Sequence, residues 1–145
     1  MATALHGLLA PRVHGQTARA VAILRIGAGL VFVAFSLGKF TRHGAEAGAF
    51  ERYGIPLADV ATYLAGATEL VCGLLLVAGL ATRPAALALA LDMAVAIATA
   101  GRIDGGPVHL GLAPVLLGVM LLLLWAGAGR PSLDARLDPS APVTA

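Results

Sequence analysis

Four long hydrophobic stretches, separated by short polar segments, dominate the chain. They cover roughly residues 21–40, 60–81, 85–100 and 108–126. Each comes close to the ~20 residues that an α-helix needs to cross about 30 Å of hydrocarbon. The pattern therefore predicts an all-α, polytopic membrane protein, in which four transmembrane helices form an antiparallel up-down bundle.

The polar segments set the predicted boundaries. Residues 1–20 are expected to form a polar tail, residues 21–127 the four-helix domain, and residues 128–145 a disordered tail. The linker of residues 41–59 mixes charged and aromatic residues and contains a helix-breaking Gly54-Ile55-Pro56. It predicts a short amphipathic segment between the first two spans, lying on the membrane surface or capping the bundle.

Composition supports the membrane class and excludes others. Hydrophobic residues make up 59% of the 145 residues, charged residues 12%, and the formal net charge is +2. That charge is too small to indicate a nucleic-acid partner. A single cysteine, Cys72, excludes a disulfide within the chain, and the four histidines lack the spacing of metal ligands. With both termini placed in the cytoplasm, five Lys or Arg lie inside and four outside, which favours that orientation by one charge.

Ionisable residues inside the predicted spans are the strongest functional signal. Arg25, Glu69 and Asp92 lie within the first three stretches. A charge in hydrocarbon costs several kcal/mol unless it is paired or faces the bundle interior. Helical geometry places Arg25 and Asp92 near one level, so they could form an ion pair across an interface of small residues. Alternatively, Arg25 could snorkel to the inner surface.

Glu69 falls near the middle of the second span, where it could relay protons, hydrogen-bond a polar ligand head, or only pack as a neutralised group. Lys39 lies about 21 Å along the first helix from Arg25. It is expected either to snorkel at the outer interface or to reach the mouth of a cavity above Glu69. His109 lies at a similar height, where an isolated histidine is most often an interfacial residue.

The order and spacing of several short motifs resemble the DoxX family over about residues 21–126. These motifs are Leu24-Arg25-Ile26-Gly27, Gly38-Lys39-Phe40, Gly54-Ile55-Pro56, Ala65-Gly66-Ala67-Thr68-Glu69-Leu70, Gly79-Leu80-Ala81-Thr82-Arg83 and Met93-Ala94-Val95-Ala96. The resemblance implies a four-helix protein of the bacterial inner membrane that is linked to quinone-, thiol- or sulfur-dependent oxidoreductase systems. Arg25, Lys39 and Glu69 match its polar positions, whereas Asp92 and His109 rest on the residue-level reasoning alone.

Three functional hypotheses follow, of which a small transporter or permeability factor is the least favoured, because the chain is short and shows no clear inverted repeat with interrupted helices. The other two are of different classes. The chain is a membrane subunit of an oxidoreductase system, with a quinone held non-covalently near Glu69, or it is a non-catalytic scaffold whose tails recruit a soluble enzyme. No self-sufficient catalytic constellation stands out in the sequence. Alanines repeat every four residues from Ala86 to Ala98, which permits a homo-oligomer without requiring one.

Overall fold

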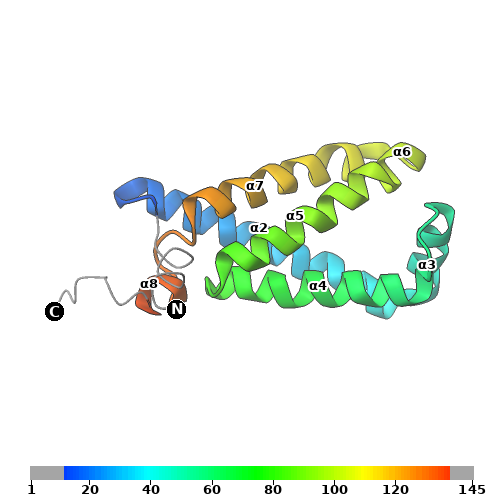
Figure 1. The fold of residues 1–145 in the computed structure, drawn as a ribbon, viewed down its shortest axis with the longest axis horizontal. Helices are drawn as coiled ribbons and strands as arrows, with labels where there is room; N and C mark the ends of the chain where they lie inside the picture. Colours follow the sequence, from blue (N-terminus) through cyan, green and yellow to red (C-terminus); the bar gives the residue numbers. More distant parts are fainter. Residues whose placement is uncertain (1–11, 138–145) are drawn as a thin grey trace.

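The structure is a computed structural model that describes residues 12–137, and within that range it is helical throughout, with no strand. Figure 1 shows the long helices running side by side along one axis, with α3 and α6 at one end and α8 at the other. The elements are α2 (Gly15–Thr41), α3 (His43–Arg52), α4 (Ala58–Ala78), α5 (Thr82–Ala98), α6 (Ala100–Ile103), the π-helical turn η1 (Val108–Leu112), α7 (Ala113–Ala126) and α8 (Leu133–Leu137).

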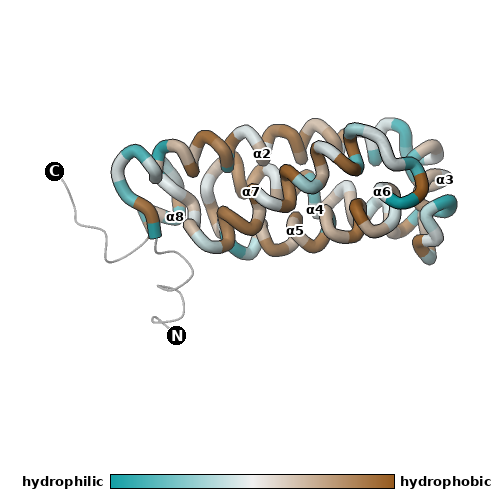
Figure 2. Tube along the Cα trace, turned by 90° about the horizontal axis from the view of Figure 1, so that it is seen from above, coloured by the Kyte–Doolittle hydropathy of each residue, from teal (hydrophilic) through white to brown (hydrophobic). Residues whose placement is uncertain are grey.

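The prediction of a four-helix membrane bundle is confirmed. Four segments in the described range are long and apolar enough to cross a bilayer: Gly15–Thr41, Ala58–Ala78, Thr82–Ile103 and Val108–Ala126. Their outward side chains are large and apolar, with Ile23 71% and Val115 63% exposed. Hydrophobic residues form the middle of the bundle and hydrophilic residues gather at its two ends, as Figure 2 shows. This distribution is the one that contact with a lipid bilayer requires.

The helices pack as two pairs, α2 against α4 and α5 against α7. The first pair crosses closely at two glycines, because a Cβ atom on Gly29 would lie 2.7 Å from the carbonyl oxygen of Gly73. Small residues permit such close approach in membrane bundles. About two turns away along α4, Gly66 lies against Lys39 and Phe40 in the same way. A Cβ atom added to Gly66 would lie only 3.0 Å from the Cβ atom of Lys39. The crossing therefore sets Lys39 directly against α4.

The linker between the first two spans contains the predicted helical segment. It forms α3 over residues 43–52, with Ala47 as its only buried residue, and a turn with Gly54 at φ +73° follows. Glycine adopts this left-handed conformation without steric cost.

Two predicted boundaries differ from the structure. Residues 15–20 belong to α2 rather than to a polar tail. The expected disorder after residue 128 is wrong for residues 128–137, which fold back onto the bundle and bury Ser132 and Asp134. Residues 138–145 and 1–11 lie outside the described part of the chain. The start and end of the described chain meet at the same end of the bundle, where the backbone N–H of Arg130 donates to the Ala18 carbonyl (3.1 Å).

Candidate functional site

A cavity of about 640 Å³ lies between the two helix pairs, at the end of the bundle that carries α3 and α6. It is lined by side chains from α2, α3, α4, α5, α6, η1 and α7. Four of the five residues singled out from the sequence line it together: Lys39, Glu69, Asp92 and His109. The rest of its inner wall is apolar, including Phe32, Phe35, Met93, Val95, Leu112 and Leu116.

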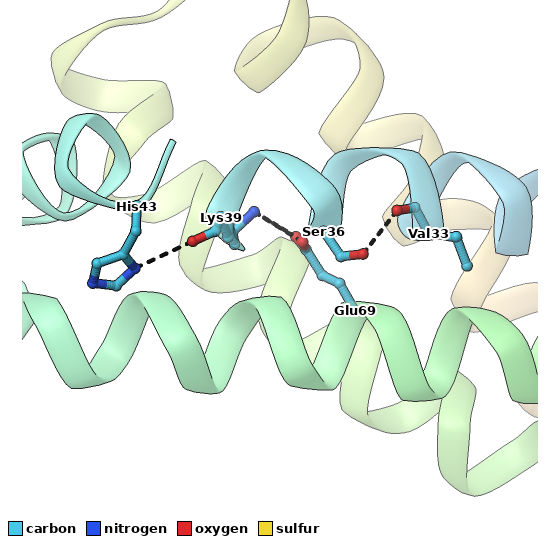
Figure 3. Close-up of polar contacts among 5 residues, drawn as sticks. All are labelled: Val33, Ser36, Lys39, His43 and Glu69. Atoms are coloured by element: carbon cyan, nitrogen blue, oxygen red, sulfur yellow. Dashed lines mark hydrogen bonds and ion pairs between the residues drawn. The ribbon is translucent and has the colours of Figure 1, made fainter. Parts of the chain in front are cut away.

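Lys39 and Glu69 form an ion pair at the inner wall of this cavity. The Lys39 ammonium donates to both carboxylate oxygens of Glu69, at 3.0 and 2.8 Å, and Figure 3 shows the two side chains reaching across from neighbouring helices. Glu69 is only 4% exposed. Of the two expectations for Lys39, the structure supports the one that directs it to the cavity. Pairing with a donor on both oxygens reduces the cost of burying the carboxylate.

Asp92 joins this pair from α5. Its carboxyl group interacts electrostatically with both Lys39 and Glu69 and lies close to the Glu69 carboxyl group. The Oδ2 atom of Asp92 is buried and has no conventional donor within the described residues. Lys39, Glu69 and Asp92 are called the charged triad below. Two carboxyl groups and one ammonium group would leave one excess negative charge if all three were ionised.

The mouth of the cavity is crossed by a polar bridge. The Tyr53 hydroxyl, just after α3, donates to Asp104 Oδ2 at the end of α6, and Arg52 Nη2 lies 3.9 Å from the same oxygen. Burial and the Asp104 carboxylate together raise the pKa of Tyr53 to about 12, so the phenol is a neutral donor at physiological pH. The His109 ring lies edge-on to Tyr53, with 6.3 Å between ring centroids. These side chains connect α3 to α6 and η1 across the opening.

His43 fixes the other end of α3 beside the charged triad. Its Nδ1 atom lies 3.2 Å from the Lys39 carbonyl oxygen, a contact drawn in Figure 3, and its Nε2 atom lies 3.0 Å from Asp59 Oδ1. The ring stacks on Tyr63 of α4, with centroids 3.7 Å apart. The neighbouring Ser36 hydroxyl donates to the Val33 carbonyl (2.7 Å) within its own helix. Ser36 is therefore occupied structurally, whereas His43 anchors α3 between the two long helices.

Arg25 does not belong to this cavity, and the predicted Arg25–Asp92 ion pair is wrong. Its guanidinium donates to four backbone carbonyls at the opposite end of the bundle: Leu76, Val77 (3.2 Å), Ala128 (2.8 Å) and Pro131 (2.8 Å). The prediction failed because Arg25 lies level with the end of α4, where it meets Leu76 and Val77, whereas Asp92 lies ten residues after the start of α5. Arg25 is 1% exposed, so it does not snorkel to the surface either.

A buried carboxylate, Asp134, completes the end that holds Arg25. Its two oxygens accept the backbone N–H groups of Ala81 (2.7 Å) and Thr82 (2.9 Å), at the start of α5. Arg25 meets the last carbonyls of α4, and Asp134 the first N–H groups of α5, so each charge opposes the partial charge of a helix end. Gly79, in the turn between these helices, leaves room for the guanidinium because an added Cβ would lie 2.6 Å from Arg25 Nη1. This arrangement is called the closed end below.

Sequence reasoning did not identify the contacts that Asp134 makes with the start of α5, nor the contact between Tyr53 and Asp104. The sequence did carry a signal for the short helix that contains Asp134. Ser132 directly precedes α8 and caps it, since its hydroxyl accepts the Ala135 N–H at 3.2 Å. A serine followed closely by a short helical run is a start signal for a helix. Nothing in the spacing of Tyr53 and Asp104, 51 residues apart, indicated their contact. Across residues 12–137, no group of three or more His, Cys, Asp or Glu side chains is arranged to hold a metal ion.

The fold and cavity define a four-helix membrane protein with an ion pair buried inside it. The DoxX family profile matches residues 20–102, more than half of the chain. A protein of Mycobacterium tuberculosis described as an uncharacterized membrane protein is 38% identical over 143 residues, covering 88% of this chain and 87% of that protein. No solved structure matches the chain. The chain belongs to the DoxX family of membrane proteins, as its sequence motifs predicted.

Proposed function

We propose that this protein is a subunit of an oxidoreductase system in the bacterial inner membrane, and that its cavity holds a quinone-class molecule. The observation that carries the proposal is the placement of the charged triad beside the apolar inner wall of a cavity whose mouth is polar. A volume of about 640 Å³ falls within the ~300–1,000 Å³ of small-molecule sites, which combine apolar walls with a few convergent polar groups. Both properties suit a flat, apolar ring that carries two oxygens.

The chain's own residues have distinct roles in this proposal. Phe32, Phe35 and Leu116 supply apolar contact to a ring, while Lys39 can donate to a quinone oxygen and the Asp92 carboxyl group can exchange a hydrogen bond with a quinone oxygen or a quinol hydroxyl. Arg52, Tyr53 and His109 close the mouth. A bound quinone would supply the two-electron chemistry, which no residue of the described chain provides. With both termini in the cytoplasm, as the Lys and Arg distribution favours, the mouth opens toward the outer side of the membrane.

The proposed function is tested by isolating the protein in native-lipid nanodiscs and extracting its apolar molecules for mass spectrometry. Wild-type protein should carry a quinone-class molecule, and Glu69→Gln should retain at least about tenfold less, because the change removes the carboxylate that holds the Lys39 ammonium at the cavity wall. Glu51→Gln is the matched control, since Glu51 is exposed on α3 and does not line the cavity. Equal retention in wild type and Glu69→Gln, or no quinone in either, would contradict the proposal.

The scaffold alternative has less support in this structure. It depends on free tails that recruit a soluble enzyme, but the stretch from Pro131 to Leu137 is packed at the closed end. Its Pro131 carbonyl accepts a hydrogen bond from Arg25, and Asp134 is 2% exposed. A partner that bound the buried side of this segment would have to displace these contacts.

A further inference from the structure

We infer that Asp92 and Glu69 share one proton, and that this carboxyl pair is the proton-exchanging group of the cavity. The inference deepens the proposed function, because it assigns the acid–base group of that same site. It begins from an unsatisfied atom. Asp92 Oδ2 is buried without a donor, although buried polar atoms are almost always hydrogen-bonded. A proton on Asp92 Oδ2 would satisfy this atom, because the oxygen would then donate to a Glu69 oxygen and would no longer need a donor.

The geometry of the triad assigns the proton to Asp92 rather than to Glu69. Both oxygens of Glu69 accept hydrogen bonds from the Lys39 ammonium, at 3.0 and 2.8 Å, and a carboxylate receives such bonds best when ionised. Asp92 lies close to Glu69, but its Oδ2 atom accepts no hydrogen bond from Lys39 or from any other group in residues 12–137. A neutral Asp92 donating to an ionised Glu69 satisfies all three groups and makes the triad electrically neutral. Neutrality is favoured strongly within the apolar part of a membrane.

Asp92 is also the member of the pair that a ligand can reach. Glu69 is 4% exposed, whereas Asp92 is only half-buried and lines the cavity. A ligand oxygen in the cavity would therefore receive the proton from Asp92, or return one to it, while Lys39 keeps Glu69 ionised. Exchange moves one proton between an Asp92 oxygen and the ligand oxygen, and no electron is transferred in this step.

Other charged or titratable groups near the pair are accounted for. Cys72 on α4 interacts electrostatically with Asp92 but makes no hydrogen bond within residues 12–137. The remaining ionisable side chains that line the cavity come from α2, α3 and its following turn, α6 and η1: Arg42, Glu46, Arg52, Tyr53, Asp104 and His109. Tyr53, Arg52 and Asp104 bind one another at the mouth. None of these groups supplies a donor to Asp92 Oδ2.

The test is infrared spectroscopy of the full-length protein in native-lipid nanodiscs, reading the carbonyl stretch of protonated carboxyl groups. Wild-type protein at neutral pH should show one such band per chain, which shifts when aspartate is labelled with carbon-13 and not when glutamate is. Asp92→Asn should remove the band while keeping the fold, because the asparagine amide can donate to Glu69 in place of the proton. Asp104→Asn, at the cavity mouth, should leave the band unchanged.

Two outcomes would overturn the inference: no protonated carboxyl band in wild-type protein at neutral pH, or a band that persists in Asp92→Asn. The labelling arm uses wild-type protein only, so it decides the question even if a variant fails to fold. Adding a short-chain benzoquinone or its quinol then separates the two proposals. A band present without ligand but insensitive to both compounds supports the shared proton and contradicts the quinone-class ligand.

Discussion

The two ends of the bundle differ in how completely the protein hydrogen-bonds its own buried charges. At the closed end, Arg25 is surrounded by four backbone carbonyls, and Asp134 accepts two backbone N–H groups. The protein's own backbone satisfies both charges. Both side chains are almost fully buried, so no ligand could reach them without opening the fold. At the other end, the charged triad borders a cavity of about 640 Å³, and one of its oxygens has no conventional donor.

The difference shows why burial of a charge does not by itself indicate function. Arg25 is more deeply buried than Lys39 or Asp92, and its sequence context suggested a site equally well. What separates the two ends is whether the hydrogen-bonding capacity of each charge is exhausted by the protein itself. A satisfied charge stabilises and specifies a structure, whereas an incompletely satisfied charge beside a cavity is available to a ligand.

The largest effect is expected from Arg25→Leu. This change leaves several buried carbonyls without donors and removes the group that joins α4 to residues 128–131, so the free energy of unfolding should fall by about 3–5 kcal/mol. Unfolding in nanodiscs, followed by loss of helical signal, measures the change. Arg19→Leu is the control, because Arg19 lies on the same helix but is exposed. A similar loss for both variants would mean that the closed end is not the main clamp.

A smaller effect is expected from Lys39→Met. It leaves Glu69 and Asp92 without a cation, which should cost about 1–3 kcal/mol of unfolding free energy. The double variant Lys39→Met/Glu69→Gln removes both charges of the ion pair and should recover most of that loss. Neither variant should retain the cavity ligand. A double variant whose loss is the sum of the two single losses would show that the two side chains are not coupled.

Much of the fold could be predicted from the sequence because it depends on local patterns. Hydrophobic length gave the four spans, and Gly54-Ile55-Pro56 indicated the break after α3. The small residues Gly66 and Gly73 lie where α2 and α4 approach most closely. These features follow from the chemistry of each segment taken alone, so they do not require knowledge of which helices become neighbours.

The candidate site was only partly predictable, since its geometry depends on helix levels and pairing. Lys39, Glu69, Asp92 and His109 were identified as unusual by their residue type and place, and all four line the cavity. Their pairing was not, because it depends on which levels of neighbouring helices meet: Arg25 lies level with the end of α4, whereas Asp92 lies ten residues after the start of α5. Distances along a helix accumulate at about 1.5 Å per residue, so ten residues of α5 separate the two charges by about 15 Å along the bundle.

The smallest effect is expected at the cavity mouth, from Tyr53→Phe. The hydroxyl of Tyr53 donates to a part-exposed Asp104, and its loss should lower the free energy of unfolding by less than about 1 kcal/mol at pH 7. Because the pKa of Tyr53 is raised to about 12 in the folded protein, the contribution of the hydroxyl is complete below pH 10 and is lost between pH 10 and about 12. Unfolding measured at pH 8 and at the upper end of this range should therefore show the free energies of unfolding of the wild type and Tyr53→Phe converging.

Tyr63→Phe is the control, since the Tyr63 hydroxyl makes no hydrogen bond within residues 12–137 and its ring stacking on His43 is retained. Convergence would show that the bridge depends on the neutral phenol, whereas a loss at pH 7 as large as that of Arg25→Leu would show that the mouth stabilises the fold as strongly as the closed end does.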